Sequence, residues 1–205
     1  MNEKKLEILE RASAVYMKFG IKSVTMDDLA RELSISKKTI YKYFNDKNDL
    51  VTSIIEMKVQ MDSAICANTT AQSDNAIDEL IQISEIVTQQ FNNFNPIVFS
   101  DLKKFHKDAW QVIENHKMTF VLKMITQNIE RGIQEKVYRT NLNTTIAAKL
   151  YLASKEAAMN PDIFTWPEFK FHDVFLEMIC LQINGMTNDK GRIYLKQKLN
   201  LNDDA

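Results

Sequence analysis

The chain has 205 residues, 45% of them hydrophobic, enough to bury a substantial core in one compact unit or in a small domain followed by a larger one. Its 26 basic and 27 acidic residues give a net charge of −1, which argues against the generally basic surface of a nonspecific nucleic-acid binder. No run of about 20 apolar residues occurs, so we expect no membrane span. Four glycines, three prolines and little strand-like alternation predict an all-α protein.

The first 20 residues predict an amphipathic helix, with Ile8, Ala12, Val15 and Phe19 on one face. They lack the apolar run of a signal peptide. The two cysteines are isolated in the sequence and suit reduced thiols. These features together predict a cytoplasmic protein.

Three possible helix starts follow within residues 25–50. Thr25 can cap a helix together with Asp28, Ser36 is a second N-cap, and Asp46 with Asp49 is a third. Caps this close together predict short helices joined by sharp turns. This is the pattern of a helix-turn-helix, which places its second helix in the DNA major groove.

The second of these helices is expected from Lys37 to Phe44. Ile40 and Phe44 lie within about 40° of each other on the helix and should point inward. From Ser36 to Lys47 four lysines face one acid, a concentrated basic region in a nearly neutral chain. The face opposite the apolar pair carries Lys38, Lys42 and Thr39, bordered by Lys37 and Tyr41 on one side and Tyr43 on the other.

Tyr41 and Tyr43 lie on or beside the exposed side of this helix. A solvated lysine face is the plainer interpretation of such a run, but it gives the tyrosines no reason to be there. A hydroxyl that reaches a phosphate oxygen does. The pattern therefore favours DNA binding.

The stretch SISKKTIYKYFNDKNDL resembles the recognition helix and following turn of the tetracycline-repressor (TetR) family. The resemblance covers roughly residues 5–52. Ser34 stands where the family usually has glycine, whose positive φ a serine can adopt at some cost. The matching positions are Ile35, Ser36, Thr39, Ile40, Tyr41, Tyr43, Phe44, Lys47 and Leu50, and upstream Ala12, Phe19, Gly20, Thr25, Leu29 and Ala30.

The resemblance implies a sequence-specific DNA-binding transcriptional regulator, usually a repressor that a small ligand releases from its operator, with activation as the alternative. The expected partners are a palindromic double-stranded operator, a second copy of the chain and a small apolar ligand, with no membrane. We expect a three-helix DNA-binding domain over residues 1–50 and a helical ligand-binding and dimerisation domain over 51–205, connected by a helix over 46–66. The resemblance assigns base contacts to Lys37, Lys38, Thr39 and Lys42, and phosphate contacts to Thr25, Tyr41, Tyr43 and Lys47.

After residue 66 the polar stretch from Ala67 to Asn75 predicts a break, which we interpret as the hinge between the two domains. Helical patterns follow, and Pro96 suits a first helical position. The expected helices cover residues 76–94, a short segment from 96, and then 107–136, 143–159, 168–185 and 189–199.

The second domain is rich in aromatic and methionine side chains. They suit plain core packing or, taken together, a plastic pocket for an apolar ligand, and the family resemblance favours the pocket. The candidate pocket residues are Phe91, Phe94, Trp110, Phe120, Met124 and Tyr151.

Residues 171–183 are apolar over a wider arc than a surface helix of a monomer needs. Such a helix either faces a partner subunit or lies buried within its own domain. By resemblance, the last long helices should form a four-helix bundle across a two-fold axis, together with residues 143–159. The candidate interface residues are Ile146, Leu150, Phe171, Val174, Phe175, Met178, Ile179 and Gln182.

The sequence contains no motif that predicts catalysis. His106, His116 and His172 lack metal-binding spacing, and neither a glycine-rich phosphate loop nor a GxSxG motif occurs. We therefore expect no catalytic residues, no metal and no cofactor. The remaining alternative is a helical adaptor whose helix-turn-helix contacts protein, and the basic, tyrosine-bearing face argues for DNA instead.

Overall fold

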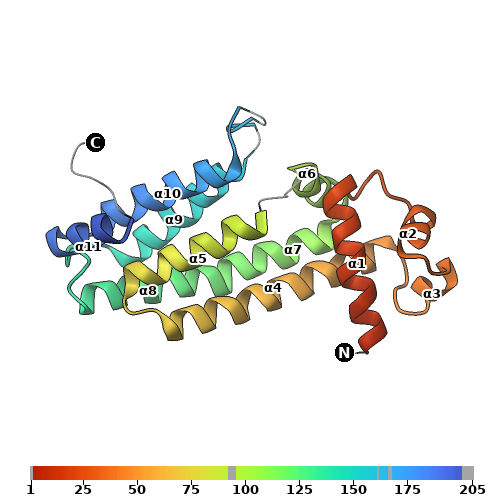
Figure 1. The fold of residues 1–205 in the computed structure, drawn as a ribbon, viewed down its shortest axis with the longest axis horizontal. Helices are drawn as coiled ribbons and strands as arrows, with labels where there is room; N and C mark the ends of the chain where they lie inside the picture. Colours follow the sequence, from red (N-terminus) through yellow and green to blue (C-terminus); the bar gives the residue numbers. More distant parts are fainter. Residues whose placement is uncertain (1, 92–95, 161, 166–167, 200–205) are drawn as a thin grey trace. The chain divides into compact units, whose positions relative to one another are not determined.

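The computed structural model describes residues 2–91, 96–160, 162–165 and 168–199, and every regular element in these ranges is a helix (Figure 1). The predicted all-α class is therefore confirmed. None of these helices is long and apolar enough to cross a membrane. The chain divides into two compact units, Met1–Ala64 with Asn93–His116, and Ile65–Asn92 with Lys117–Ala205. They are called unit 1 and unit 2 below.

Unit 1 contains the predicted helix-turn-helix and two later helices. Its elements are α1 (Glu3–Phe19), α2 (Met26–Leu33), α3 (Lys37–Tyr41), the first part of α4 (Lys47–Gln72), α6 (Pro96–Phe105) and α7 (Lys107–His116). Their apolar faces meet in one core, whose most deeply buried members include Ile8, Leu9, Ala12, Leu29, Leu33, Ile40, Phe44, Leu50 and Ala109. This core holds α3 in place through its inward residues.

The three helix starts predicted within residues 25–50 are confirmed. Thr25 and Asp28 form a reciprocal capping box at the start of α2, and the Ser36 side chain caps α3. Before α4, Asp46 Oδ1 accepts a hydrogen bond from the backbone N–H of Asp49 at 2.8 Å. Each cap satisfies backbone donors that a helix start leaves open, so the chain can turn sharply twice in a short distance.

Ser34 ends α2 in the left-handed conformation, with φ 54° and ψ 40°. Its N–H donates to the carbonyls of Ala30 and Arg31. Serine thus adopts the backbone conformation for which the family usually uses glycine, as the sequence predicted. The left-handed residue redirects the chain from α2 into α3.

The recognition helix is shorter than predicted. Helix α3 ends at Tyr41 instead of Phe44, although the N–H of Phe44 still donates to the carbonyl of Ile40 at 3.1 Å. Ile40 and Phe44 are 0% and 1% exposed, so both point inward as expected.

The hinge predicted at Ala67–Asn75 is wrong, because α4 continues through most of that stretch to Gln72. Its polar side chains are used within the fold: Thr69 and Ser73 are buried and donate to carbonyls one turn earlier. The guanidinium of Arg131 also donates to the Ser73 carbonyl at 2.8 Å. A polar sequence here indicates a solvated and hydrogen-bonded helix end, not a linker.

Unit 2 is a bundle in which α5 packs on α8 and α10, and α9 packs on α8 and α10 (Figure 1). A π-helical turn, η1, joins α7 to α8, so the long helix predicted over 107–136 contains one irregular turn. Gly132 allows the ring of Tyr138 to pack directly on α8, since an added Cβ would lie 2.1 Å from that ring. The elements are the end of α4, α5 (Ala76–Phe91), η1 (Lys117–Val121), α8 (Leu122–Gln134), α9 (Thr144–Ala158), α10 (Phe171–Met186) and α11 (Asp189–Leu199).

The segment Asn93–His116 belongs to unit 1 by its contacts. Asp101 accepts a hydrogen bond from the backbone N–H of Lys22 at 2.8 Å, and Asp108 accepts one from the Asn48 amide at 2.7 Å. The two units divide the chain by its contacts, whereas the boundary expected at residue 50 separates a DNA-binding domain from a ligand-binding domain. That functional boundary stays a prediction.

Candidate nucleic-acid interface

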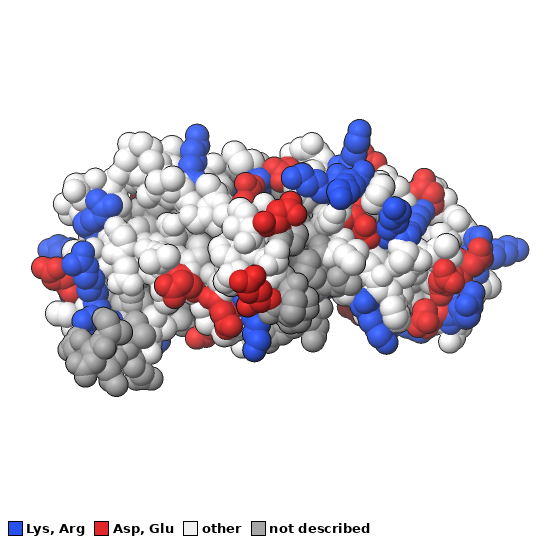
Figure 2. Space-filling model, turned by 90° about the horizontal axis from the view of Figure 1, so that it is seen from above, with Lys and Arg blue, Asp and Glu red and all other residues white. Residues whose placement is uncertain are grey.

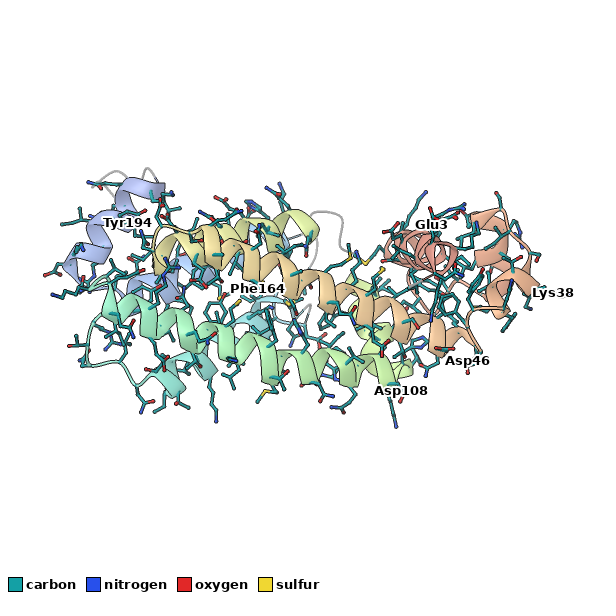
Figure 3. The ribbon with its side chains drawn as sticks, turned by 90° about the horizontal axis from the view of Figure 1, so that it is seen from below. Glu3, Lys38, Asp46, Asp108, Phe164 and Tyr194 are labelled. Carbon is teal, nitrogen blue, oxygen red and sulfur yellow. The ribbon has the colours of Figure 1, made fainter. Side chains whose placement is uncertain are left out.

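The outer face of α3 carries the residues predicted to contact DNA. Lys38 and Lys42 are exposed, Thr39 is half-buried and Tyr41 is 42% exposed. In Figure 3, Lys38 extends outward at the end of unit 1 that carries α3. Because Ile40 anchors the opposite side in the core, the orientation of this face is fixed by packing.

A surface hollow brings most of the predicted contact residues together. It is lined by Ser36, Lys38, Thr39, Tyr41, Lys42 and Tyr43. The ammonium of Lys42 lies 5.8 Å from the ring centroid of Tyr43, within cation–π range. Neither Lys38 nor Lys42 forms an ion pair within the described ranges. Two lysine ammonium groups are therefore available to acceptors in a DNA groove.

Two of the predicted contact residues are held by carboxylates of α2. The Lys37 ammonium donates to Asp27 Oδ2 at 2.9 Å, and this hydrogen bond raises the pKa of Lys37. The Thr25 hydroxyl donates to Asp28 Oδ2 at 2.6 Å, and that bond lowers the pKa of Asp28. The sequence analysis assigned Asp27 no role, and its contact with Lys37 joins the first turn of α2 to the first residue of α3.

Lys47 has contacts that the sequence did not predict. Its ammonium donates to the carbonyls of Ile21 and Val24 at 2.6 and 2.7 Å, and it lies 5.9 Å from the ring centroid of Tyr16. Burial lowers the pKa of Lys47. The side chain thus ties the α1–α2 loop to the start of α4, and its predicted phosphate contact would compete with these bonds.

The helix-turn-helix is also where known proteins match this chain. Residues 8–54 match the model of the bacterial regulatory proteins of the tetR family. The HTH-type transcriptional regulator YvaF of Bacillus subtilis (strain 168) is 27% identical over 175 residues, which cover 82% of this chain and 88% of that protein. The helix-turn-helix region is thus that of the TetR family, and most of the chain is similar to an HTH-type transcriptional regulator. The protein is therefore a DNA-binding transcriptional regulator and not an enzyme, which also removes the adaptor alternative.

Solved structures show that the likeness extends over the whole fold. A TetR-family regulator from Agrobacterium tumefaciens superposes with a TM-score of 0.75 at 16% identity, covering 90% of this chain and 98% of the other. The fatty acid degradation regulator FadR from Bacillus halodurans gives a TM-score of 0.73 at 15% identity, with 90% and 97% covered. At these identities the likeness concerns the fold.

The predicted pocket residues that the structure describes are distributed over both units. Trp110 packs against the unit 1 core, with its ring edge-on to Phe99 at 5.2 Å. Phe120, Met124 and Tyr151 pack in or against the unit 2 core, where Tyr151 is 4% exposed. Phe94 and the side chain of Phe91 lie outside the described residues.

A separate cavity of about 210 Å³ lies between α5 and α10 within unit 2. None of the four predicted pocket residues whose side chains the structure describes lines it. Its walls are formed by Ile81, Ser84, Glu85, Thr88, His172, Leu176, Ile179, Cys180, Ile183 and Leu199. Within the described ranges, no group of three or more His, Cys, Asp or Glu side chains is arranged to hold a metal ion.

The predicted dimer face requires a correction on α10. Phe175, Met178 and Ile179 are 1%, 8% and 2% exposed within the single chain, so a partner subunit would have almost no surface there to cover. The wide apolar arc arises because α10 packs against both α5 and α9 in its own unit. Phe171 and Val174 are half-buried, and Gln182 donates to the Ser154 hydroxyl on α9 at 2.9 Å.

Other predicted interface residues are exposed. Ile146 and Leu150, one turn apart on α9, are both 57% exposed, and Leu181 on α10 is 64% exposed. Leu181 was not among the predicted interface residues. No signal in the sequence separated it from its buried neighbours, because Leu181 belongs to the same wide apolar arc.

Proposed function

We propose that this TetR-family regulator is a repressor that binds a palindromic operator as a homodimer and leaves it when a small apolar ligand binds. The observation that carries the proposal is the outer face of α3. There, Lys38 and Lys42 project into solvent without acidic partners in the described ranges while Ile40 anchors the helix from behind. An α-helix fits the major groove, and lysine suits the O6 and N7 acceptors of guanine.

The neighbouring side chains suit contacts with the DNA backbone. Tyr41 and Tyr43 flank the lysines, and their hydroxyls can donate to phosphate oxygens. Thr25 is the N-cap of α2, and its hydroxyl can donate to a phosphate oxygen in place of Asp28 Oδ2. In this arrangement the lysines and Thr39 read bases, while the tyrosines and Thr25 set the register of α3 in the groove.

The test is quantitative footprinting on a duplex selected from a random pool by the wild-type protein. Lys38→Ala and Lys42→Ala should each reduce discrimination against a shuffled duplex by about 1–3 kcal/mol. Lys58→Ala is the matched control, because Lys58 is an exposed lysine on α4, outside the helix-turn-helix. If the double variant protects the selected duplex as well as wild type, α3 is not the reading helix.

Dimerisation is supported by the exposed apolar side chains of α9 and α10 described above. A helix as short as α3 reads few base pairs, so two copies on a two-fold symmetric site give the needed specificity. Ile146, Leu150 and Leu181 supply an apolar surface without the buried residues of α10. The second copy would cover them in a helical bundle.

Ligand control is supported by the apolar and methionine-bearing interior of unit 2, which includes Phe120, Met124 and Tyr151. Fatty acids are suitable first probes because one structurally similar protein is named a regulator of their degradation. A ligand that releases DNA must bind the free protein more tightly than the DNA-bound protein by the same factor. Calorimetry of a binding fatty acid with and without the selected duplex measures this factor. Equal affinities would refute release by that ligand.

A further inference from the structure

The acidic residue Asp27 lies at the DNA-facing end of the helix-turn-helix and pairs with a residue of the reading helix. Asp27 is in the first turn of α2, and Lys37 is the first residue of α3. Their side chains meet at 2.9 Å, with Asp27 66% and Lys37 46% exposed. The pair thus stands at the surface, where DNA would compete for it.

Asp27 is not a capping residue of α2, although its carboxylate in the first turn interacts favourably with the helix dipole. The capping box of α2 is formed by Thr25 and Asp28, and Asp27 takes no part in it. Within the described residues, its side chain makes one hydrogen bond, the one from Lys37. A carboxylate placed beside a DNA-binding face opposes binding through its charge, so its presence there calls for a role that involves Lys37.

The lysines of α3 fall into two classes. Lys38 and Lys42 have no carboxylate partner in the described ranges, whereas Lys37 has one. On the face shown in Figure 2, acidic and basic side chains are interspersed at the end of unit 1 that carries α2. Phosphate contacts supply nearly all of the attraction that is independent of sequence, while base contacts supply discrimination. An acid that neutralises one phosphate-binding lysine therefore reduces the attraction that is independent of sequence. It leaves the base contacts, which supply the discrimination between DNA sequences, unchanged.

We propose that Asp27 is a specificity-determining residue that holds Lys37 back from DNA phosphates and thereby weakens nonspecific binding more than operator binding. The inference rests on the proposed function, since it assumes that α3 is the reading helix. The pair is exposed and exchangeable, so it acts by competition: a phosphate must displace Asp27 from Lys37 while being repelled by it. Lys38 and Lys42 read bases without this restraint.

Asp27→Asn tests the proposal, because the amide keeps the shape of the side chain and removes its charge. Affinity is measured for the selected duplex and for a shuffled duplex of equal length and composition, between 50 and 200 mM salt. The freed Lys37 should add one phosphate contact, steepening the salt dependence on the shuffled duplex by about 0.9. The gain in nonspecific affinity should then be roughly 3.5-fold larger at 50 mM than at 200 mM salt. The ratio of specific to nonspecific affinity should fall.

Two further variants separate the effect of losing the Asp27–Lys37 contact from the effect of removing one negative charge. Glu32→Gln removes one negative charge from the same helix, and Glu32 is exposed and forms no ion pair in the described ranges, so the salt slope should stay as in wild type. In a Lys37→Gln background, Asp27→Asn should no longer steepen the slope. A steepening of the same size in that background would overturn the proposal, because Asp27 would then act by repulsion alone.

A second result would also overturn it. If Asp27→Asn lowers affinity for the selected duplex and leaves the shuffled duplex unchanged, Asp27 positions Lys37 on a base instead of restraining it. Lys38→Ala, measured in the same titrations, separates these outcomes from failure of the proposed function. If Lys38→Ala leaves discrimination intact, α3 does not read the DNA, whatever Asp27→Asn does.

Discussion

Lys47 should contribute to the stability of unit 1 through its two backbone hydrogen bonds. Its ammonium bridges the carbonyls of Ile21 and Val24, residues that are 3% and 5% exposed, across the loop between α1 and α2. Lys47→Met keeps the length and the apolar stem of the side chain but removes both donors. The variant therefore isolates the polar contribution from packing.

The size of the effect follows from those contacts. A hydrogen bond from a charged donor contributes about 1.5–3 kcal/mol, and carbonyls left without a donor in a buried loop cost further free energy. Part of this gain is offset because the ammonium is partly desolvated, as the lowered pKa of Lys47 indicates. The net expectation is a loss of roughly 2 kcal/mol in the free energy of unfolding. In a chain of this length that corresponds to a fall in Tm of about 4–8 °C.

The measurement is urea denaturation, combined with hydrogen exchange of the backbone amides in residues 20–25. Lys58→Met is the control, since Lys58 is an exposed lysine on the same helix. The family resemblance predicts a different outcome, in which Lys47 serves a phosphate. An unchanged free energy of unfolding, with a salt slope of DNA binding reduced by about 0.9, would refute the structural role argued here.

Three further outcomes are expected. Ser34→Gly should raise the free energy of unfolding by about 0.5–1 kcal/mol in urea denaturation, because glycine adopts the left-handed conformation of this position without steric cost; a destabilised variant would contradict this. Burial lowers the pKa of His106, whose ring pairs with Asn48, so the folded chain binds this proton less tightly than the unfolded chain. Stability should therefore fall as pH drops from about 7 through the unfolded pKa of about 6.5 toward the lower folded pKa, and His106→Gln should flatten that fall in denaturation curves. Leu150→Glu with Leu181→Glu should give a folded monomer in sedimentation, and a variant that remains dimeric would remove these residues from the interface.

The sequence predicted the helix-turn-helix well because its determinants are local. Thr25 with Asp28, and Asp46 with Asp49, lie three residues apart, so each cap can be recognised without knowing the fold. The pairing of Lys37 with Asp27 spans ten residues and depends on how α3 packs against α2. No rule of spacing within one helix identifies such a pair.

Unit 2 was harder to predict for a related reason. The apolar residues of α10 cover a wide arc of the helix, and sequence alone does not say which neighbours cover which part of it. The structure buries Phe175 against its own unit and leaves Leu181 exposed. The hinge prediction was wrong for the same reason. The polar end of α4 is held by Arg131, which lies 58 residues from Ser73 in the sequence.

The continuity of α4 matters for the proposed response of the DNA-binding face to ligand. Helix α4 begins in unit 1, beside the contacts of Lys47, and ends in unit 2, where Arg131 donates to the Ser73 carbonyl and pairs with the buried Glu79. A flexible linker at the end of α4 would absorb a displacement, whereas a continuous helix with hydrogen-bonded ends passes it on. The proposed coupling therefore depends on the polar contacts at both ends of α4. Weakening the Arg131 end should lower the coupling between ligand and DNA without changing base discrimination, which resides in Lys38 and Lys42.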